Sequence, residues 1–276
     1  MNRNTSKIAI LGAGRMGSAL HRSLANAGRP STLLSRQQTE REVRESISSS
    51  EVVFLCVPDA RIASVAQHHA DAFHPGQLVA HCAGALTLAE LAHAAARGAD
   101  VGSMHPLCAI ASPETSLVGV HAAIAGSDSA LTHLRKLAQA LEMVPFEVRD
   151  ADRARYHAAA ALAANGLMAL TAQSAELLTS CGLDSKQALT ALLPLMRSAL
   201  VALDRRGLPD ALTGPIARGD EATIERHLAS LSRPNDALIR TTYRALSQTL
   251  VTLSSAPPEA LDAIAASLDD IDRKLP

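Results

Sequence analysis

One stretch of the chain spaces polar side chains as acid–base chemistry on a small molecule would require. Arg153, His157 and Asn165 lie at intervals of four and eight residues within 152–180, a stretch with a helical pattern. Side chains four residues apart share one face of a helix. An imidazole can deliver a proton, and an amide can hydrogen-bond a carbonyl or carboxylate. We therefore predict that His157 and Asn165 are catalytic and that Arg153 binds substrate. The alternative is a His157 that is merely hydrogen-bonded inside a domain interface.

Further candidates stand at the ends of predicted strands and near a helix start. His105 in "SMHPL" and His81 in "HCAGA" each end an apolar run. Ligands bind at the carboxyl edge of parallel sheets, so we predict His105 as catalytic and His81 as substrate-binding. The alternative for His105 is that it closes the loop. Arg218 in "TGPIARGD" can hold a carboxylate with two hydrogen bonds, or it can form a solvated pair with Asp220.

The segment "IAILGAGRMGSAL", residues 8–20, has the pattern of a phosphate-binding turn between a strand and a helix. The first glycine allows a tight turn, the second lets a pyrophosphate approach the backbone, and the third lets the helix pack closely. The helix start then offers free N–H groups to the phosphates. The alternative is a structural glycine turn. The predicted contacts with a dinucleotide are Gly12, Ala13, Gly14, Arg15, Met16 and Gly17.

The next two predicted strand ends complete a cofactor site. An NAD-binding unit usually carries Asp or Glu after its second strand, whereas this chain has Ser35 and Arg36. A hydroxyl and a guanidinium favour the 2′-phosphate of NADP(H). The alternative is that Arg36 is a solvated loop residue. The strand in 52–57 stops at Pro58, and Val57, Pro58 and Asp59 are predicted to line the site.

These residues require a sheet whose strands alternate with helices. Apolar strand patterns alternate with helical patterns up to about residue 150, and only helical patterns follow. The sequence therefore predicts an α/β domain over 1–150 with a parallel sheet covered on both faces. An all-α domain over 151–276 is expected to contact substrate. Between Arg36 and Val52 there is room for one short helix, so the strand that usually follows is expected to be missing.

The composition excludes several classes of partner. The formal net charge is −1 and no long basic run occurs, so no nucleic-acid partner is expected. No stretch reaches the length of a membrane span. The four cysteines are far apart and, without a signal peptide, indicate a cytoplasmic protein with reduced thiols. His68, His69 and His93 lack the sequence spacing of metal ligands, so no metal site is expected.

Taken together, several motifs resemble a known family. "GAGRMGSAL", "VVFLCVPD" and "HCAGAL" are similar to the dinucleotide-binding half of pyrroline-5-carboxylate reductases and 6-phosphogluconate or hydroxyacid dehydrogenases. "SMHPL", "DRARYHAAAALAANGL", "LLPLMRSAL" and "ALTGPIARGD" resemble the Rossmann-plus-DUF2520 family over nearly the whole chain. The resemblance implies a Rossmann NADP domain followed by a helical domain, as in ketopantoate reductases. His105 resembles the histidine of "HPMAG" in prephenate dehydrogenases.

The resemblance also shapes the expected reaction. It implies hydride transfer from NADPH to the C=O of a small carboxylate-bearing substrate, such as a ketopantoate-like 2-oxo acid, held between the domains. The alternatives are a pyrroline-5-carboxylate-like imine reductase and a dinucleotide-binding sensor or scaffold without turnover. Ala161 stands where the hydroxyacid and ketopantoate enzymes carry a lysine. The apolar face with Leu193 and Leu200 predicts a homodimer through the helical domain.

Overall fold

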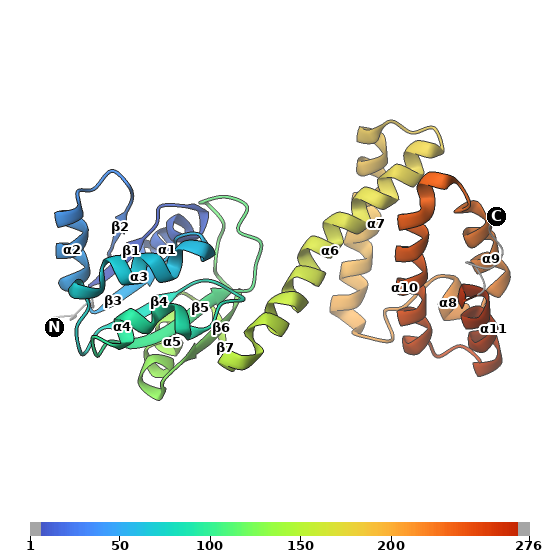
Figure 1. Ribbon diagram of the computed structural model, residues 1–276. Helices are drawn as coiled ribbons and strands as arrows, with labels where there is room; N and C mark the ends of the chain where they lie inside the picture. Colours follow the sequence, from blue (N-terminus) through green and yellow to red (C-terminus); the bar gives the residue numbers. More distant parts are fainter. Residues whose placement is uncertain (1–6, 270–276) are drawn as a thin grey trace. The chain divides into compact units, whose positions relative to one another are not determined.

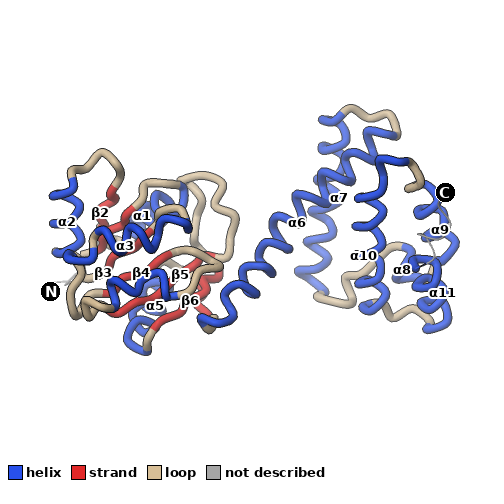
Figure 2. Tube along the Cα trace, viewed as in Figure 1, coloured by secondary structure: helices blue, strands red, loops and turns tan. Residues whose placement is uncertain are grey.

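The computed structural model describes residues 7–269, and its strands all lie in the first part of the chain (Figure 2). They form one seven-stranded sheet in the order β2-β1-β3-β4-β5-β6-β7. Its strands are β1 Ile8–Leu11, β2 Ser31–Leu34, β3 Val52–Leu55, β4 Leu78–His81, β5 Asp100–Pro106, β6 His121–Gly126 and β7 Val144–Glu147. The predicted α/β fold class is therefore confirmed, and the carboxyl ends of β1 to β5 meet at one edge of the sheet.

Both faces of the sheet are covered by helices. These helices are α1 Arg15–Asn26, α2 Glu40–Ser48, α3 Ile62–His68, α4 Ala92–Ala95 and α5 Asp128–Ala140. Alternate strand residues point to opposite faces: Ile8 and Ile10 pack with α1 and α5, whereas Ala9 and Leu11 pack with α2, α3 and α4. Because both faces are buried, each central strand is apolar throughout, which is the pattern that predicted it.

The direction of β6 differs from the expectation, whereas the absence of a strand after α2 agrees with it. The prediction of a wholly parallel sheet is wrong for β6 and β7, since β6 runs antiparallel to β5. The residues between β5 and β6, 107–120, form a loop without a helix, whereas parallel neighbours are usually joined by a crossover helix. The missing strand is confirmed: β2 is the sheet edge, and α2 leads directly to β3 on the other side of β1.

Capping side chains mark the starts of α2 and α7. Thr39 caps α2 in a reciprocal capping box with Glu42, and Asp184 does the same with Gln187 at the start of α7. Between β3 and β4, α3 lies between two short 3₁₀ turns. Between β4 and β5, a 3₁₀ turn is followed by the single turn of α4.

Only helices follow β7 among the described residues (Figure 1). They are α6 Arg153–Ser180, α7 Ser185–Arg206, α8 Pro215–Arg218, α9 Glu221–Ser230, α10 Ala237–Leu253 and α11 Pro258–Asp269. Ile216, Ile224, Leu228, Ile264 and Leu268 form a small core that joins α8, α9 and α11. None of the helices in residues 7–269 has the length and apolarity needed to cross a lipid bilayer.

The chain divides into two compact units inside α6, between Gly166 and Leu167. The first turns of α6 thus belong with the sheet, because the buried Arg153 bonds to the ends of its strands. The change of architecture near residue 150 and the division between compact units therefore lie at different positions. The first unit is called the sheet unit below, and the second the helical unit.

Candidate functional site

The glycine turn after β1 has a backbone that only glycine fits at two of its three positions. Gly12 has φ +114°, and a Cβ there would lie 2.5 Å from the Cys56 carbonyl oxygen. A Cβ on Gly17 would lie 1.9 Å from the Gly12 carbonyl oxygen, so α1 packs directly on the turn. Gly14 differs, because a Cβ there would meet no atom within 4 Å. The turn therefore leaves open space in front of Gly14, at the start of α1, where no side chain caps the helix.

A cavity of about 860 Å³ opens beside this turn. Its walls come from the glycine turn, from the ends of β2 and β3, and from α2 and α3. Its size is within the range of cofactor sites. The predicted cofactor residues that line it are Gly12, Ala13, Gly14, Ser35, Arg36, Val57 and Pro58. The other predicted contacts, Arg15, Met16, Gly17 and Asp59, are not among its lining residues.

Three polar residues that sequence reasoning missed also line this cavity: Gln37, Arg61 and His69. Arg61 ends the 3₁₀ turn that follows Pro58, two residues after the predicted Asp59. Arg36 and Arg61 thus bring two guanidinium groups to one cavity from different strand ends. Arg61 could have been predicted from its position just after the end of β3, because the turn after Pro58 keeps the chain at the edge of the sheet.

A second group of polar side chains lies at the ends of β4 and β5 and on the first turn of α6. His105 Nδ1 is 2.7 Å from the Tyr156 hydroxyl, and the His105 and His157 rings are 6.0 Å apart in an edge-to-face arrangement. A Cβ on Gly84 would lie 2.4 Å from His157 Cδ2 and 2.9 Å from His105 Nε2. Gly84 is thus required for both imidazoles to approach the chain after β4. These residues, His105, Tyr156, His157 and Gly84, are called the histidine cluster below.

Burial sets the protonation of this cluster. It lowers the pKa of His105 to about 4, with smaller contributions from His157, Arg153 and His81. Burial also raises the pKa of Tyr156 to about 12. At neutral pH His105 is therefore an uncharged imidazole and Tyr156 a protonated phenol, and the proton in their hydrogen bond can be shared between the two side chains.

Tyr156 was not predicted, because the stripe chosen on α6 ran through His157 and skipped its neighbour. The Phe146 ring of β7 packs edge-to-face on Tyr156, with centroids 5.9 Å apart. This contact and the His105 hydrogen bond fix the phenol. The contact is invisible to helical spacing, since its partners are 10 and 51 residues away along the chain.

His81 and Arg153 lie beneath the cluster instead of at its surface. Both are fully buried. Arg153 donates hydrogen bonds to Ser103 Oγ and to the Ala83 carbonyl, each at 2.5 Å. His81 Nε2 is 3.3 Å from the Thr87 carbonyl oxygen, and burial, followed by the charge of Arg153, lowers the pKa of His81 to about 4. Direct substrate contact does not fit either residue; they fasten α6 and the loop after β4 to the sheet.

The cavity and the histidine cluster are joined by two cysteines at successive strand ends. Cys56 lines the cavity at the end of β3, and its Sγ is 3.6 Å from Sγ of Cys82 at the end of β4. The contact with Cys82, together with burial, raises the pKa of Cys56 well above its usual value. The Cys56 thiol thus stays protonated at neutral pH, in contact with Cys82.

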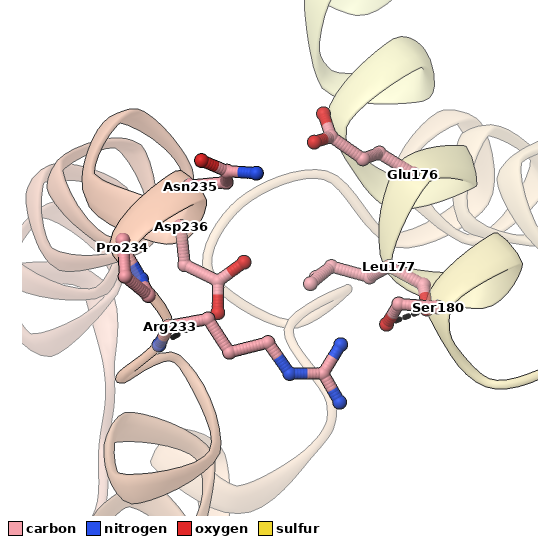
Figure 3. Close-up of a pocket in the computed structure, with 7 residues that line it drawn as sticks. All are labelled: Glu176, Leu177, Ser180, Arg233, Pro234, Asn235 and Asp236. Atoms are coloured by element: carbon pink, nitrogen blue, oxygen red, sulfur yellow. Dashed lines mark hydrogen bonds between the residues drawn. The ribbon is translucent and has the colours of Figure 1, made fainter.

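The remaining predicted site residues are Asn165 and Arg218. Asn165 is exposed on α6, eight residues and about 12 Å along the helix axis from His157. Arg218, in the helical unit, lies 3.8 Å from Asp220, and its side chain is largely exposed. A separate cavity of about 400 Å³ in the helical unit is lined by Glu176, Leu177, Ser180, Arg233, Pro234, Asn235 and Asp236, and Arg218 is not among them (Figure 3).

Family comparisons agree with this arrangement. Residues 1–106 match a Rossmann-like domain, and residues 120–250 match a domain of unknown function, DUF2520. Together the two matches confirm the resemblance drawn from the motifs. The curated proteins contain no significant match to the chain.

Solved structures share the fold over nearly the whole chain. A provisionally named NADP oxidoreductase from Bacteroides fragilis is 22% identical, with a TM-score of 0.68, covering 89% of this chain and 97% of its own. Pyrroline carboxylate reductase from Plasmodium falciparum, with NADP bound, is 11% identical, with a TM-score of 0.60 and 97% of each chain covered. A reductive aminase from Aspergillus terreus in complex with NADPH is 15% identical, with a TM-score of 0.58, covering 98% of this chain and 95% of its own. The chain therefore has the fold of NADP-dependent oxidoreductases.

Proposed function

We propose that this chain, in which a Rossmann-like domain is followed by a DUF2520 domain, is an NADP-dependent reductase. The observation that carries the proposal is the cavity beside the glycine turn, with open space at Gly14 and with Arg36 and Arg61 in its walls. The names of three similar structures include NADP or NADPH, which supports the same cofactor. Likeness of fold alone would leave both the cofactor and the reaction open.

The residues present fit NADP(H). The space before Gly14 would admit the pyrophosphate at the start of α1, whose free N–H groups favour anions. Ser35, Arg36 and Arg61 would hold the 2′-phosphate through charge-assisted hydrogen bonds. No carboxylate lines the cavity to repel that phosphate. When bound, the cofactor supplies a hydride.

The histidine cluster would supply the proton that a carbonyl needs as the hydride arrives. Tyr156 can donate to His105 Nδ1, which leaves the proton of the neutral imidazole on Nε2, beside Gly84. His105 would give its Nε2 proton to the substrate oxygen and take the Tyr156 proton on Nδ1. The products are then an alcohol and a tyrosinate, which solvent reprotonates. His157 is exposed beside His105 and would orient the substrate.

For the substrate we propose the C=O of a small carboxylate-bearing molecule, such as a 2-oxo acid. The second candidate is the C=N of a cyclic imine, which is favoured by the similarity to pyrroline carboxylate reductase and reductive aminase. A dinucleotide sensor without turnover is the third reading.

The deciding experiment measures NADPH oxidation across a panel of 2-oxo acids and cyclic imines. Turnover with one class, lost in the His105→Ala variant with NADPH affinity kept, would support the reductase and identify the bond reduced. Tight NADPH binding without oxidation across the whole panel would favour the sensor. Absence of NADPH binding would overturn the proposal.

We further propose the homodimer expected from the sequence. Leu195, Leu200 and Leu203 of α7 are each exposed by 42% or more. Burying such side chains against a second copy would remove apolar surface from water. Light scattering after size-exclusion chromatography tests this: a mass of one chain at micromolar concentration would contradict it.

A further inference from the structure

We propose that Glu40, His68 and His69 form a binding site for a zinc-class divalent cation. His69 also lines the cofactor cavity, whereas Glu40 and His68 do not, and none of the three takes part in the proposed hydride transfer. Sequence spacing gave no sign of them, because Glu40 begins α2, whereas His68 ends α3 and His69 follows it. In the sheet unit α2 and α3 lie close to each other (Figure 1), and the Glu40 side chain of α2 meets His68 and His69.

The distances between the three ligand atoms suit one ion. Glu40 Oε1 lies 3.1 Å from His68 Nε2 and 3.6 Å from His69 Nδ1, and all three atoms lie within 4.8 Å of one another. Ligands about 2 Å from a tetrahedral zinc ion are themselves about 3.3 Å apart. Small side-chain rotations would therefore complete three ligand positions, with the exposed side left for water.

The unsatisfied nitrogen of His69 is an independent sign of a ligand. His69 is only 7% exposed, and its Nδ1 has no hydrogen-bond partner. A buried polar atom without a partner costs free energy that a native structure usually avoids. This atom points toward Glu40, so an ion held between the two would satisfy it.

The charges around Glu40, His68 and His69 tolerate a cation. Arg44 Nε is 2.8 Å from Glu40 Oε1, which alone would repel an ion. However, Arg44 is also 3.1 Å from Asp71 Oδ2 and donates to the His68 carbonyl. With neutral imidazoles, Glu40, Arg44 and Asp71 carry a net charge of −1, so a divalent ion leaves the group at +1. Two imidazoles and one carboxylate are a ligand set that suits zinc better than magnesium or calcium.

The test is calorimetric titration of the metal-stripped full chain with zinc chloride. We expect one ion per chain, with binding at least about tenfold weaker in Glu40→Gln and lost in His69→Ala. Glu45→Gln is the matched control, since Glu45 is an exposed carboxylate on the same helix, paired with Arg41. His93→Ala is the control for an exposed histidine outside the proposed cation site. Neither control should change the affinity.

Cobalt spectroscopy separates this site from the cysteines. Cobalt bound by Glu40, His68 and His69 would give no thiolate charge-transfer band, whereas cobalt at Cys56 and Cys82 would give a strong one. Because His69→Ala can disturb packing, Glu40→Gln carries the decision: its carboxylate is half exposed, and the amide keeps its size. Zinc affinity unchanged in Glu40→Gln, or a thiolate band in the cobalt spectrum, would overturn the proposal.

Discussion

The cavity beside the glycine turn and the histidine cluster share one edge of the sheet but are built in different ways. The cavity is open space framed by backbone and small residues, with Gly12, Gly14 and Pro58 in its wall. The histidine cluster is a half-buried network, in which His105 contacts both Tyr156 and His157 and the two imidazoles lie against Gly84. The properties of the cavity therefore depend mainly on its shape. The properties of the histidine cluster depend mainly on hydrogen bonding and on burial away from water.

This difference assigns cofactor binding to the cavity and proton transfer to the histidine cluster. A change in the cavity should alter cofactor affinity, whereas a change in the cluster should alter turnover while the cofactor still binds. Cys56 and Cys82 stand at the border between the two regions. The variants below test that separation, from the largest expected effect to the smallest.

Removing the imidazole of His105 should have the largest effect. We expect His105→Ala to lower kcat by roughly 10²–10⁴, the usual contribution of general acid–base catalysis, with an unchanged Kd for NADPH. Tyr156→Phe should lower kcat less, because His105 keeps one proton on its ring. Steady-state kinetics and fluorescence titration measure the two quantities. His93→Ala, an exposed histidine of the sheet unit, is the control. Full turnover in His105→Ala would remove the cluster from the mechanism.

Filling the space before Gly14 should abolish tight cofactor binding without unfolding the protein. A Cβ there meets no protein atom, so Gly14→Val should keep its melting temperature. We expect NADPH binding to weaken on the order of 100-fold, about 2.7 kcal/mol. Gly166→Ala, where a Cβ also meets nothing, should leave the affinity unchanged. Equal affinities of Gly14→Val and the unmodified chain would show that the pyrophosphate lies elsewhere.

The guanidinium groups should decide between NADPH and NADH. Arg36→Ala removes a charge-assisted contact with the 2′-phosphate, so NADPH binding should fall by roughly 10-fold while NADH binding changes little. Arg61→Ala should act in the same direction. Arg41→Ala, an exposed arginine on α2, is the control. Parallel loss of NADPH and NADH affinity in Arg36→Ala would contradict a role in 2′-phosphate recognition.

Acid should destabilise the sheet unit through its buried histidines. Burial lowers the pKa of His81 and of His105 from 6.5 to about 4. Between these values the unfolded chain binds more protons than the folded chain, so stability falls as the pH falls from about 6.5 to about 4. Melting temperatures measured across this window should drop less steeply in His105→Gln. An identical slope would show that the pKa of His105 is the same in the folded and the unfolded protein, which would contradict the lowered pKa.

At the carboxyl edge of the sheet, the backbone could be predicted from the sequence better than the contacts between side chains. The roles of Gly12 and Gly17 follow from turn geometry, which local sequence encodes, and the absence of a strand after α2 follows from chain length. Tyr156 and the cluster at Glu40 depend on contacts between residues 28 to 51 positions apart, which no local pattern reveals. Arg153 lies on α6 as expected but is fully buried, which the spacing could not reveal because spacing gives a face and not its burial. The direction of β6 was missed because strand patterns carry no direction.

The most direct test of the central claim is a crystal structure of the protein with NADPH. We predict the pyrophosphate at the start of α1 in front of Gly14, the 2′-phosphate on Ser35, Arg36 and Arg61, and the nicotinamide toward Cys82 and the histidine cluster. NADPH bound away from the glycine turn, or a turn that excludes it, would contradict the account.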